Sequence, residues 1–177
     1  MKTKIIKNNS GISILEVIVA ILIITIGMVG VLSLVIQNIQ AQYINRNILI
    51  ASGLAQEGLE LVRNIRDLNW LTPGNAWDKD LAPVSGQHKF VIDYRGRSSL
   101  ADIAGIDAIA AILNIDNSSG FYWHGAGTDS MFKRMLTVEK ITIAGAEYLL
   151  DVKCTIRWRD GAENHDYTAE TYLYNWR

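Results

Sequence analysis

"GISILEVIVAILIITIGMVGVLSLVIQ", residues 11–37, is the stretch that decides the fold of this chain. Residues 17–36 carry no charge, and fourteen of them are Leu, Ile or Val. A helix that crosses a bilayer needs about 20 consecutive apolar residues. On an insertion scale, these aliphatic side chains together favour the membrane by roughly −4 to −8 kcal/mol. The sequence therefore predicts a single transmembrane helix at residues 12–36.

The charges around this segment predict its orientation. Lys2, Lys4 and Lys7 precede it with no acid among them. Basic residues next to a span stay in the cytoplasm, so we expect the N-terminus inside and the C-terminal part outside. Removing three lysines from the 17 basic residues leaves 14 against 18 acidic ones, a formal charge of −4. This charge argues against direct nucleic-acid binding.

Glu16 is the one charge near the start of the apolar stretch. One interpretation is a capping box, because Ser13 and Glu16 have the S-x-x-E spacing in which each side chain binds a backbone amide of the first helical turn. That interpretation does not account for Gly11. A cleaved secretory signal fits poorly, because its apolar core has only about 7–15 residues.

Gly11 followed by "ISILEVIVAILIITIGMVGV" resembles the N-terminal motif of type IV prepilins and type II secretion pseudopilins. That motif combines a short basic leader, a glycine and an apolar helix with glutamate as its fifth mature residue, and Glu16 is fifth from Ile12. The resemblance implies a leader of residues 1–11, cleavage by a prepilin peptidase between Gly11 and Ile12, and methylation of the Ile12 amine. Residues 54–70, "LAQEGLELVRNIRDLNW", also resemble a segment of minor pilins.

The resemblance also implies a role for Glu16 in filament assembly. A lone buried carboxylate costs several kcal/mol unless it is paired. Cleavage creates a positively charged amine on Ile12, on the same or a neighbouring chain, and this amine is the expected partner of Glu16. The implied partners of the whole chain are prepilin peptidase, other pilins or pseudopilins, an assembly platform protein and ATPase, and membrane lipid.

The apolar pattern continues beyond the predicted span with helical spacing. Apolar or small residues recur in steps of three and four at Ile44, Ile48, Ala51, Ala55, Leu59 and Val62. We therefore predict one helix over residues 13–69, whose part at 37–70 is amphipathic, ended by the turn-forming Pro73 and Gly74. Gly53 and Gly58 indicate either close packing or tolerated weak points in this helix.

From residue 87 onward the apolar period changes to two, which is typical of strands. Strands are predicted at 90–95, 132–143, 150–159 and 167–176, with a possible bulge at Lys140 and turns at residues 144–145 and 160–161. A short strand is possible at 121–124. Residues 98–117 have the least distinct pattern, and within them residues 101–113 could be helix, or loop and short strand.

The expected fold class is α+β. An antiparallel sheet of about four strands in the head, residues 71–177, needs a cover on one face, and the outer half of the long helix is the available cover. This architecture, with the inner half of the helix in the membrane, is the pilin fold that the resemblance implies.

No residue pattern predicts catalysis, a cofactor or a metal site. The histidines His88, His124 and His165 lack metal-ligand spacing. The only cysteine, Cys154, lies on the apolar parity of its strand and is expected in the core. Ser130 and Lys133 match S-x-x-K without the companion motifs of penicillin-binding enzymes.

Two further features leave a choice open. The pairs Asp78 with Asp80 and Asp116 with Asn117 could coordinate calcium, although neither forms an EF-hand pattern. The aromatic residues Trp158, Tyr172, Tyr174 and Trp176 are expected as core and sheet-surface pairs in preference to a sugar platform.

The favoured interpretation is a non-enzymatic structural subunit, a minor pilin or pseudopilin, anchored in the cytoplasmic membrane and drawn into an extracytoplasmic filament. The alternative from another class is an uncleaved single-pass membrane-anchored binding module. A membrane-tethered enzyme comes third. The machine could serve adhesion, motility, DNA uptake or secretion, and the sequence does not choose among them.

Overall fold

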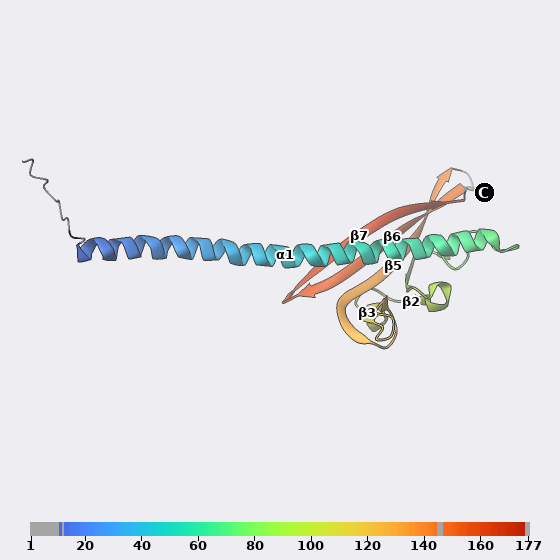
Figure 1. Cartoon of the computed structure of the whole chain (residues 1–177). Coiled ribbons are helices and arrows are strands. Elements are labelled where there is room, and N and C mark those ends of the chain that lie inside the picture. The colour runs from blue at the N-terminus through green and yellow to red at the C-terminus, as the bar shows by residue number, and fades with distance from the viewer. Residues whose placement is uncertain (1–10, 12, 145–146, 176–177) are drawn as a thin grey trace, which may run out of the picture. The chain divides into compact units, whose positions relative to one another are not determined.

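The computed structural model describes residue 11, residues 13–144 and residues 147–175 (Figure 1). The chain divides into two compact units, residues 1–46 and 47–177, and each is described by itself. Helix α1 (Ile14–Leu71) contributes to both. The later elements are β1 (Gln87–Val91), η1 (Gly96–Ser99), β2 (Ala101–Asp102), η2 (Ile109–Ala111), β3 (Ile112–Ile115), β4 (Tyr122–Trp123), β5 (Thr128–Ala144), β6 (Glu147–Asp160) and β7 (Glu163–Tyr174).

Helix α1 confirms the predicted long helix and extends two residues past its expected end. At its C-terminus the Thr72 amide and hydroxyl both donate to the Leu68 carbonyl, at 3.1 and 2.8 Å. Gly74 follows with φ of 85°, a left-handed conformation that glycine adopts without strain. The Thr-Pro-Gly sequence thus ends the helix as expected.

The second part of α1, within residues 47–71, covers one face of the sheet (Figure 1). Its buried residues recur at helical spacing and form one stripe: Asn47, Ala51, Leu54, Ala55, Gly58, Leu59, Val62, Ile65 and Asn69. This stripe shares a single core with apolar side chains of β1, β3, β5 and β6. Burial against the sheet stabilises a helix whose solvent face is charged.

In the part of the chain that the structure describes, the sheet has seven strands, all antiparallel, where about four were expected. The four predicted strands correspond to β1, β5, β6 and β7, and the short strands β2, β3 and β4 account for the difference. Strand β5 is central: β6 pairs along one side of it, and β3 and β1 pair with successive parts of the other side. Strand β7 pairs with β6.

The possible bulge at Lys140 needs correction, and the choice left open at residues 101–113 is decided in favour of loop and short strand. The β5–β6 pairing is regular at Lys140, which lies opposite Leu150, and the register shift comes later, between Thr142 and Ala144. The change of apolar parity at Lys140 instead marks where β5 leaves the covered face, since residues 140–142 are all exposed. Residues 98–117 contain no α-helix; they form η1, β2, η2 and β3.

The turn between β6 and β7 falls at the predicted place, with Gly161 at φ of 59°. The short strand expected near 121–124 is β4. Of the predicted turn at 144–145, residue 145 lies outside the described residues, as does Trp176 at the end of the predicted last strand.

Candidate functional site

The first turn of α1 carries the residues that the sequence singled out for processing and assembly. Gly11 is exposed, and Ile12 lies outside the described residues. The Leu15 amide donates to the Ser13 hydroxyl at 3.3 Å, and the Val17 amide donates to the Ser13 carbonyl at 3.2 Å. Ser13 therefore caps the helix through the second amide of the first turn. Glu16 lies in this turn and is exposed.

The structure shows only part of the capping box considered for Ser13 and Glu16. Ser13 supplies a cap, but its hydroxyl receives the Leu15 amide and not the Glu16 amide that a capping box uses. Within the described residues, no hydrogen bond from the Ser13 backbone amide to the Glu16 carboxylate is found. Glu16 is thus the one charged side chain of the exposed, apolar segment of α1 at residues 14–36.

The surface of α1 that follows Glu16 is apolar on every side. Seventeen large apolar side chains between residues 14 and 39 are largely exposed: Ile14, Leu15, Val17, Ile18, Val19, Ile21, Leu22, Ile23, Ile24, Ile26, Val29, Val31, Leu32, Leu34, Val35, Ile36 and Ile39, and Met28 is exposed as well. None of the most apolar 18-residue window is buried within the chain. A helix that is apolar all round is buried in a large core or in a membrane. By length and composition α1 could span a membrane.

The hydroxyl groups inside this apolar segment are satisfied by the helix itself. Thr25 donates to the Leu22 carbonyl at 2.8 Å, and Ser33 donates to the Val29 carbonyl at 3.0 Å. Such back-bonding lets Ser and Thr lie in an apolar environment without a separate partner. Glu16 is therefore the one side chain of residues 14–36 whose burial requires a partner from elsewhere.

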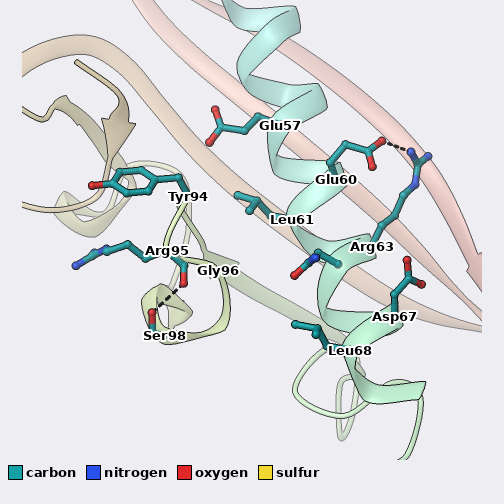
Figure 2. A pocket seen from close by; sticks show the side chains of 11 residues that line it. Glu57, Glu60, Leu61, Arg63, Asp67, Leu68, Tyr94, Arg95, Gly96 and Ser98 are labelled. Carbon is teal, nitrogen blue, oxygen red and sulfur yellow. Dashed lines mark hydrogen bonds and ion pairs between the residues drawn. The ribbon is translucent and has the colours of Figure 1, made fainter. Parts of the chain in front are cut away.

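The head carries an open groove of about 750 Å³ between α1 and the loop that follows β1 (Figure 2). Its α1 wall includes Glu57, Leu61, Asn64 and Leu68, which share one face because they are spaced by three and four residues. The opposite wall is the segment 94–98. Figure 2 shows Leu61 pointing toward that segment, and Glu60, Arg63 and Asp67 also line the groove.

Asp93 holds the loop wall of the groove in place. Its fully buried carboxylate accepts the Arg95 amide and guanidinium at 2.9–3.1 Å and the His124 amide at 3.1 Å. Burial alone would raise the pKa of Asp93, but the hydrogen bonds from Arg95, His124 and Ser99 outweigh it and lower that pKa to about 2. The Asp93 amide in turn donates to the Ser99 hydroxyl at 2.9 Å.

The charged groups of the groove are already paired. Glu60 binds Arg63 on the same helix, and Asp67 binds Arg66 at 2.9 Å. Arg95 binds Asp93 and lies over the Trp123 ring, with its guanidinium carbon 4.7 Å from the ring centroid. The groove thus offers the apolar atoms of Leu61, Leu68 and Tyr94 beside compensated charges, which suits a weakly polar ligand or a peptide segment.

Each predicted histidine has a separate structural environment. His88 directs its ring nitrogens to the Leu81 carbonyl at 3.0 Å and the Asp102 carboxylate at 2.8 Å. Burial and the nearby Arg134 charge lower the pKa of His124 to about 4. His165 stacks on Trp158, with the ring centroids 5.4 Å apart. Within the described residues, no group of three or more His, Cys, Asp or Glu side chains could hold a metal ion.

The two pairs considered for calcium have protein donors on their carboxylates. Asp78 accepts the Tyr148 hydroxyl at 2.6 Å. Asp116 accepts the Ser118 amide and hydroxyl at 2.9 and 2.8 Å and the Ser119 hydroxyl at 2.7 Å. These hydrogen bonds, the Ser118 amide first, lower the pKa of Asp116. The Asp116 carboxylate therefore organises its own loop, whereas the Asp78 carboxylate joins its loop to β6 through Tyr148.

Ser130 and Lys133 do not come together. The Ser130 hydroxyl donates to the Leu113 carbonyl, and the Lys133 ammonium pairs with Asp107 at 3.4 Å. Residues three apart on a strand point to opposite faces, so this S-x-x-K match carries no chemistry. Cys154 is fully buried, as predicted, and burial raises the pKa of its thiol to about 12.

The aromatic residues of the last two strands divide between the core and the solvent face. Trp158 is buried and lies 6.2 Å from Phe132 between ring centroids. Tyr172 and Tyr174 are about half exposed. These placements agree with core and surface roles.

One buried residue was missed by the sequence patterns. Arg134 is fully buried on the helix-facing side of β5 and donates to the Leu54 carbonyl at 3.2 Å and the Ile92 carbonyl at 2.6 Å. Its ion-pair partner is Glu57 at 3.4 Å. The signal was present, because Arg134 occupies an apolar-parity position between Phe132 and residue 136.

Comparison of the chain with models of known protein families, with curated proteins and with solved structures found no significant match.

Proposed function

We propose that this chain is a minor pilin or pseudopilin, a structural subunit that assembles into a type IV pilus or a type II secretion-like filament through its N-terminal helix. The observation that carries the proposal is the apolar surface of α1, which is exposed all round within the chain and holds one acid, Glu16, in its first turn. An apolar helix with one acid is suited to lipid first and to a bundle of like helices afterwards.

The proposed processing supplies a partner for the otherwise unpaired carboxylate of Glu16. In the membrane, Glu16 lies near the cytoplasmic interface, where water and headgroups limit the cost of its charge. Prepilin peptidase cuts after Gly11, and the new amine of Ile12 is methylated and stays positively charged. That amine then pairs with Glu16 when helices of neighbouring subunits pack. Buried ion pairs of this kind act more through registry than through net stability.

The head has a supporting role in this proposal. Its sheet holds the second part of α1 through a continuous core, so the helix that enters the filament is joined to a stable domain. The chain itself is not an enzyme; the peptidase, the platform protein and the ATPase act on it. The head is extracytoplasmic, and its net negative charge suits a protein surface better than a nucleic acid.

The processing step is tested by intact-mass measurement of the full chain expressed in bacterial membranes with and without a prepilin peptidase. We expect loss of residues 1–11 and gain of one methyl group only when the peptidase is present. Gly11→Val should block cleavage, whereas Gly27→Ala is the matched control, since a methyl group there meets nothing within 4 Å. A native N-terminus that persists with active peptidase would refute the proposal.

The assembly step is tested with Glu16→Gln in a cell that makes the filament. We expect normal insertion and cleavage but loss of the subunit from sheared filaments. Thr25→Val is the control, because it removes a polar group of the same helix that bonds only to its own backbone. Incorporation of Glu16→Gln at the wild-type level would contradict the role of this carboxylate.

The second candidate function is an uncleaved, membrane-anchored binding module, and the groove beside Leu61 and Tyr94 is the observation that favours it. The mass measurement distinguishes the two. An intact leader, together with a ligand whose binding is lost in Tyr94→Ala, would support the binding module.

A further inference from the structure

The two edges of the sheet differ in the length of their outermost strands. On one side of β5 the sheet ends in β2 and β4, which have two residues each. On the other side it ends in β7, which has twelve. Within the described residues, β7 pairs with β6 alone. Its outer edge therefore presents a long row of backbone N–H and C=O groups.

Among the devices that protect a sheet edge, strand β7 has acidic side chains but no shortening, lysine, proline or bulge. Native edges are blunted by short strands, lysine, proline or bulges. The sequence of β7, "ENHDYTAETYLY", contains no lysine, arginine, proline or glycine. Its register with β6 is continuous from Leu149 opposite Tyr174 to Asp160 opposite Glu163. A long and regular edge of this kind is a template for one more strand.

The side chains of β7 indicate which strand would fit. Burial alternates along it, and the exposed side carries Asp166, Thr168, Glu170, Tyr172 and Tyr174. Carboxylates attract cationic side chains on a neighbouring strand, and tyrosine rings add cation–π contacts. The edge thus matches a strand with lysine or arginine at alternate positions.

The same acids disfavour a second copy of this chain as the occupant. Two antiparallel copies of β7 related by a two-fold axis through Thr168 would place Asp166 opposite Glu170, and like charges in that arrangement are destabilising. Every self-paired register also doubles the carboxylates on the pair while adding no cation. Asp166 and Glu170 already hold Arg157 and Lys153 of β6, so backbone pairing supplies most of the affinity for any occupant.

We propose that the outer edge of β7 is a docking site for an extended, basic strand of another polypeptide, which adds to the sheet as its next strand. Alternate side chains of that strand would lie beside Asp166, Glu170 and Tyr172 on the exposed side. The others would lie beside Tyr167 and Ala169, which are half-buried on the helix-facing side. This inference goes beyond the proposed function and does not depend on processing of the leader.

The test uses the full chain in mild detergent and two labelled peptides of about ten residues, the length of a typical strand. One alternates lysine with valine and the other alternates glutamate with valine. Binding is measured by fluorescence anisotropy. We expect the lysine peptide to bind at least about tenfold more tightly than the glutamate peptide, because only its charges complement β7.

Alternate N-methylation of the lysine peptide tests the backbone contact directly. In strand pairing, every second amide of the added strand bonds to the edge. We therefore expect one of the two alternately methylated peptides to lose about tenfold or more in affinity and the other to keep most of it. Hydrogen exchange should slow at alternate amides of β7 when the unmethylated peptide binds.

A matched pair of variants locates the site. Thr168→Lys adds a cation on β7 itself, and Thr155→Lys adds the same cation one strand inward, on β6, where Thr155 pairs with Thr168. We expect Thr168→Lys to weaken binding of the lysine peptide by about threefold or more and Thr155→Lys to weaken it less. Thermal unfolding checks that both variants fold.

Several results would overturn the proposal. Absence of binding up to about 1 mM peptide would do so, as would equal losses with both methylated peptides or exchange protection outside β7. Dimerisation of the full chain that Thr168→Lys abolishes and that the lysine peptide does not displace would show that the occupant is a second copy.

Discussion

Replacing Gly58 by alanine probes the closest approach between α1 and the sheet. A Cβ atom on Gly58 would lie 2.7 Å from the Cys154 sulfur and 3.4 Å from the Arg134 Cδ. Carbon atoms in favourable contact are about 3.5–4.0 Å apart, so the added methyl group overlaps the sulfur. Helix and sheet must separate slightly, or Cys154 must move within a full core.

The expected free-energy change follows from two opposing effects. Alanine favours a helix over glycine by about 1 kcal/mol. Overpacking a core costs typically 1–3 kcal/mol. We expect Gly58→Ala to lower the free energy of unfolding by up to about 2 kcal/mol, because the clash offsets or outweighs the helix preference. Gly53→Ala is the matched control: nothing lies within 4 Å of its Cβ position, and it should gain about 0.5–1 kcal/mol.

A double-mutant cycle identifies the clashing atom. Cys154→Ala removes the sulfur and should cost about 1 kcal/mol alone. In that background, Gly58→Ala should become neutral or stabilising, which corresponds to a coupling of about 1–3 kcal/mol. Urea unfolding of the full chain in mild detergent, followed by tryptophan fluorescence, measures each value. Additive effects, or equal stabilities of Gly58→Ala and Gly53→Ala, would refute the reasoning.

Two further predictions concern the charges of the head. Glu57→Gln leaves the buried Arg134 without its counter-ion. We expect the free energy of unfolding, measured with urea, to fall by only about 1–2 kcal/mol, since Glu57 is partly exposed. The control is Glu60→Gln, whose partner Arg63 is on the surface, and it should change the free energy of unfolding by less than about 0.5 kcal/mol. The pKa of Asp93 is lowered from 3.8 to about 2, so its carboxylate stabilises the fold above about pH 4 and that contribution is lost as pH falls toward 2. Asp93→Asn should flatten this part of the pH–stability profile, and an unchanged profile would contradict the assignment.

The sequence predicts the long elements well because their periodicity is strong. The helical spacing from Ala51 to Val62 and the alternation from residue 150 to 158 both reflect burial of one face, and the structure places these faces in one core. Ile44 and Ile48, which continue the same spacing, lie outside that core, and Ile48 is exposed. The glycines illustrate the limit of such patterns. Gly53 and Gly58 look alike in sequence, yet only Gly58 lies against the sheet, because contact between distant segments is not encoded in local spacing.

The groove could not be predicted for a related reason. Its loop wall depends on Asp93, a polar residue buried by hydrogen bonds to Arg95 and to the distant His124 amide. Local patterns assign such a residue to the surface. Segment 98–117 was ambiguous because its short elements are stabilised by pairing with β1, β4 and β5, and not by their own propensity. The processing residues Gly11, Ile12 and Glu16 remain predictions.

The order of elements along the chain has a consequence for synthesis of the protein. The apolar stripe of α1 begins at Ala51, whereas Leu173, which completes the same core, is made 122 residues later (173 − 51). At about 5–20 residues per second, roughly ten seconds separate the two on the ribosome. During that interval the stripe has no sheet to cover it. The apolar stripe of the nascent head therefore stays uncovered until β5, β6 and β7 have been made.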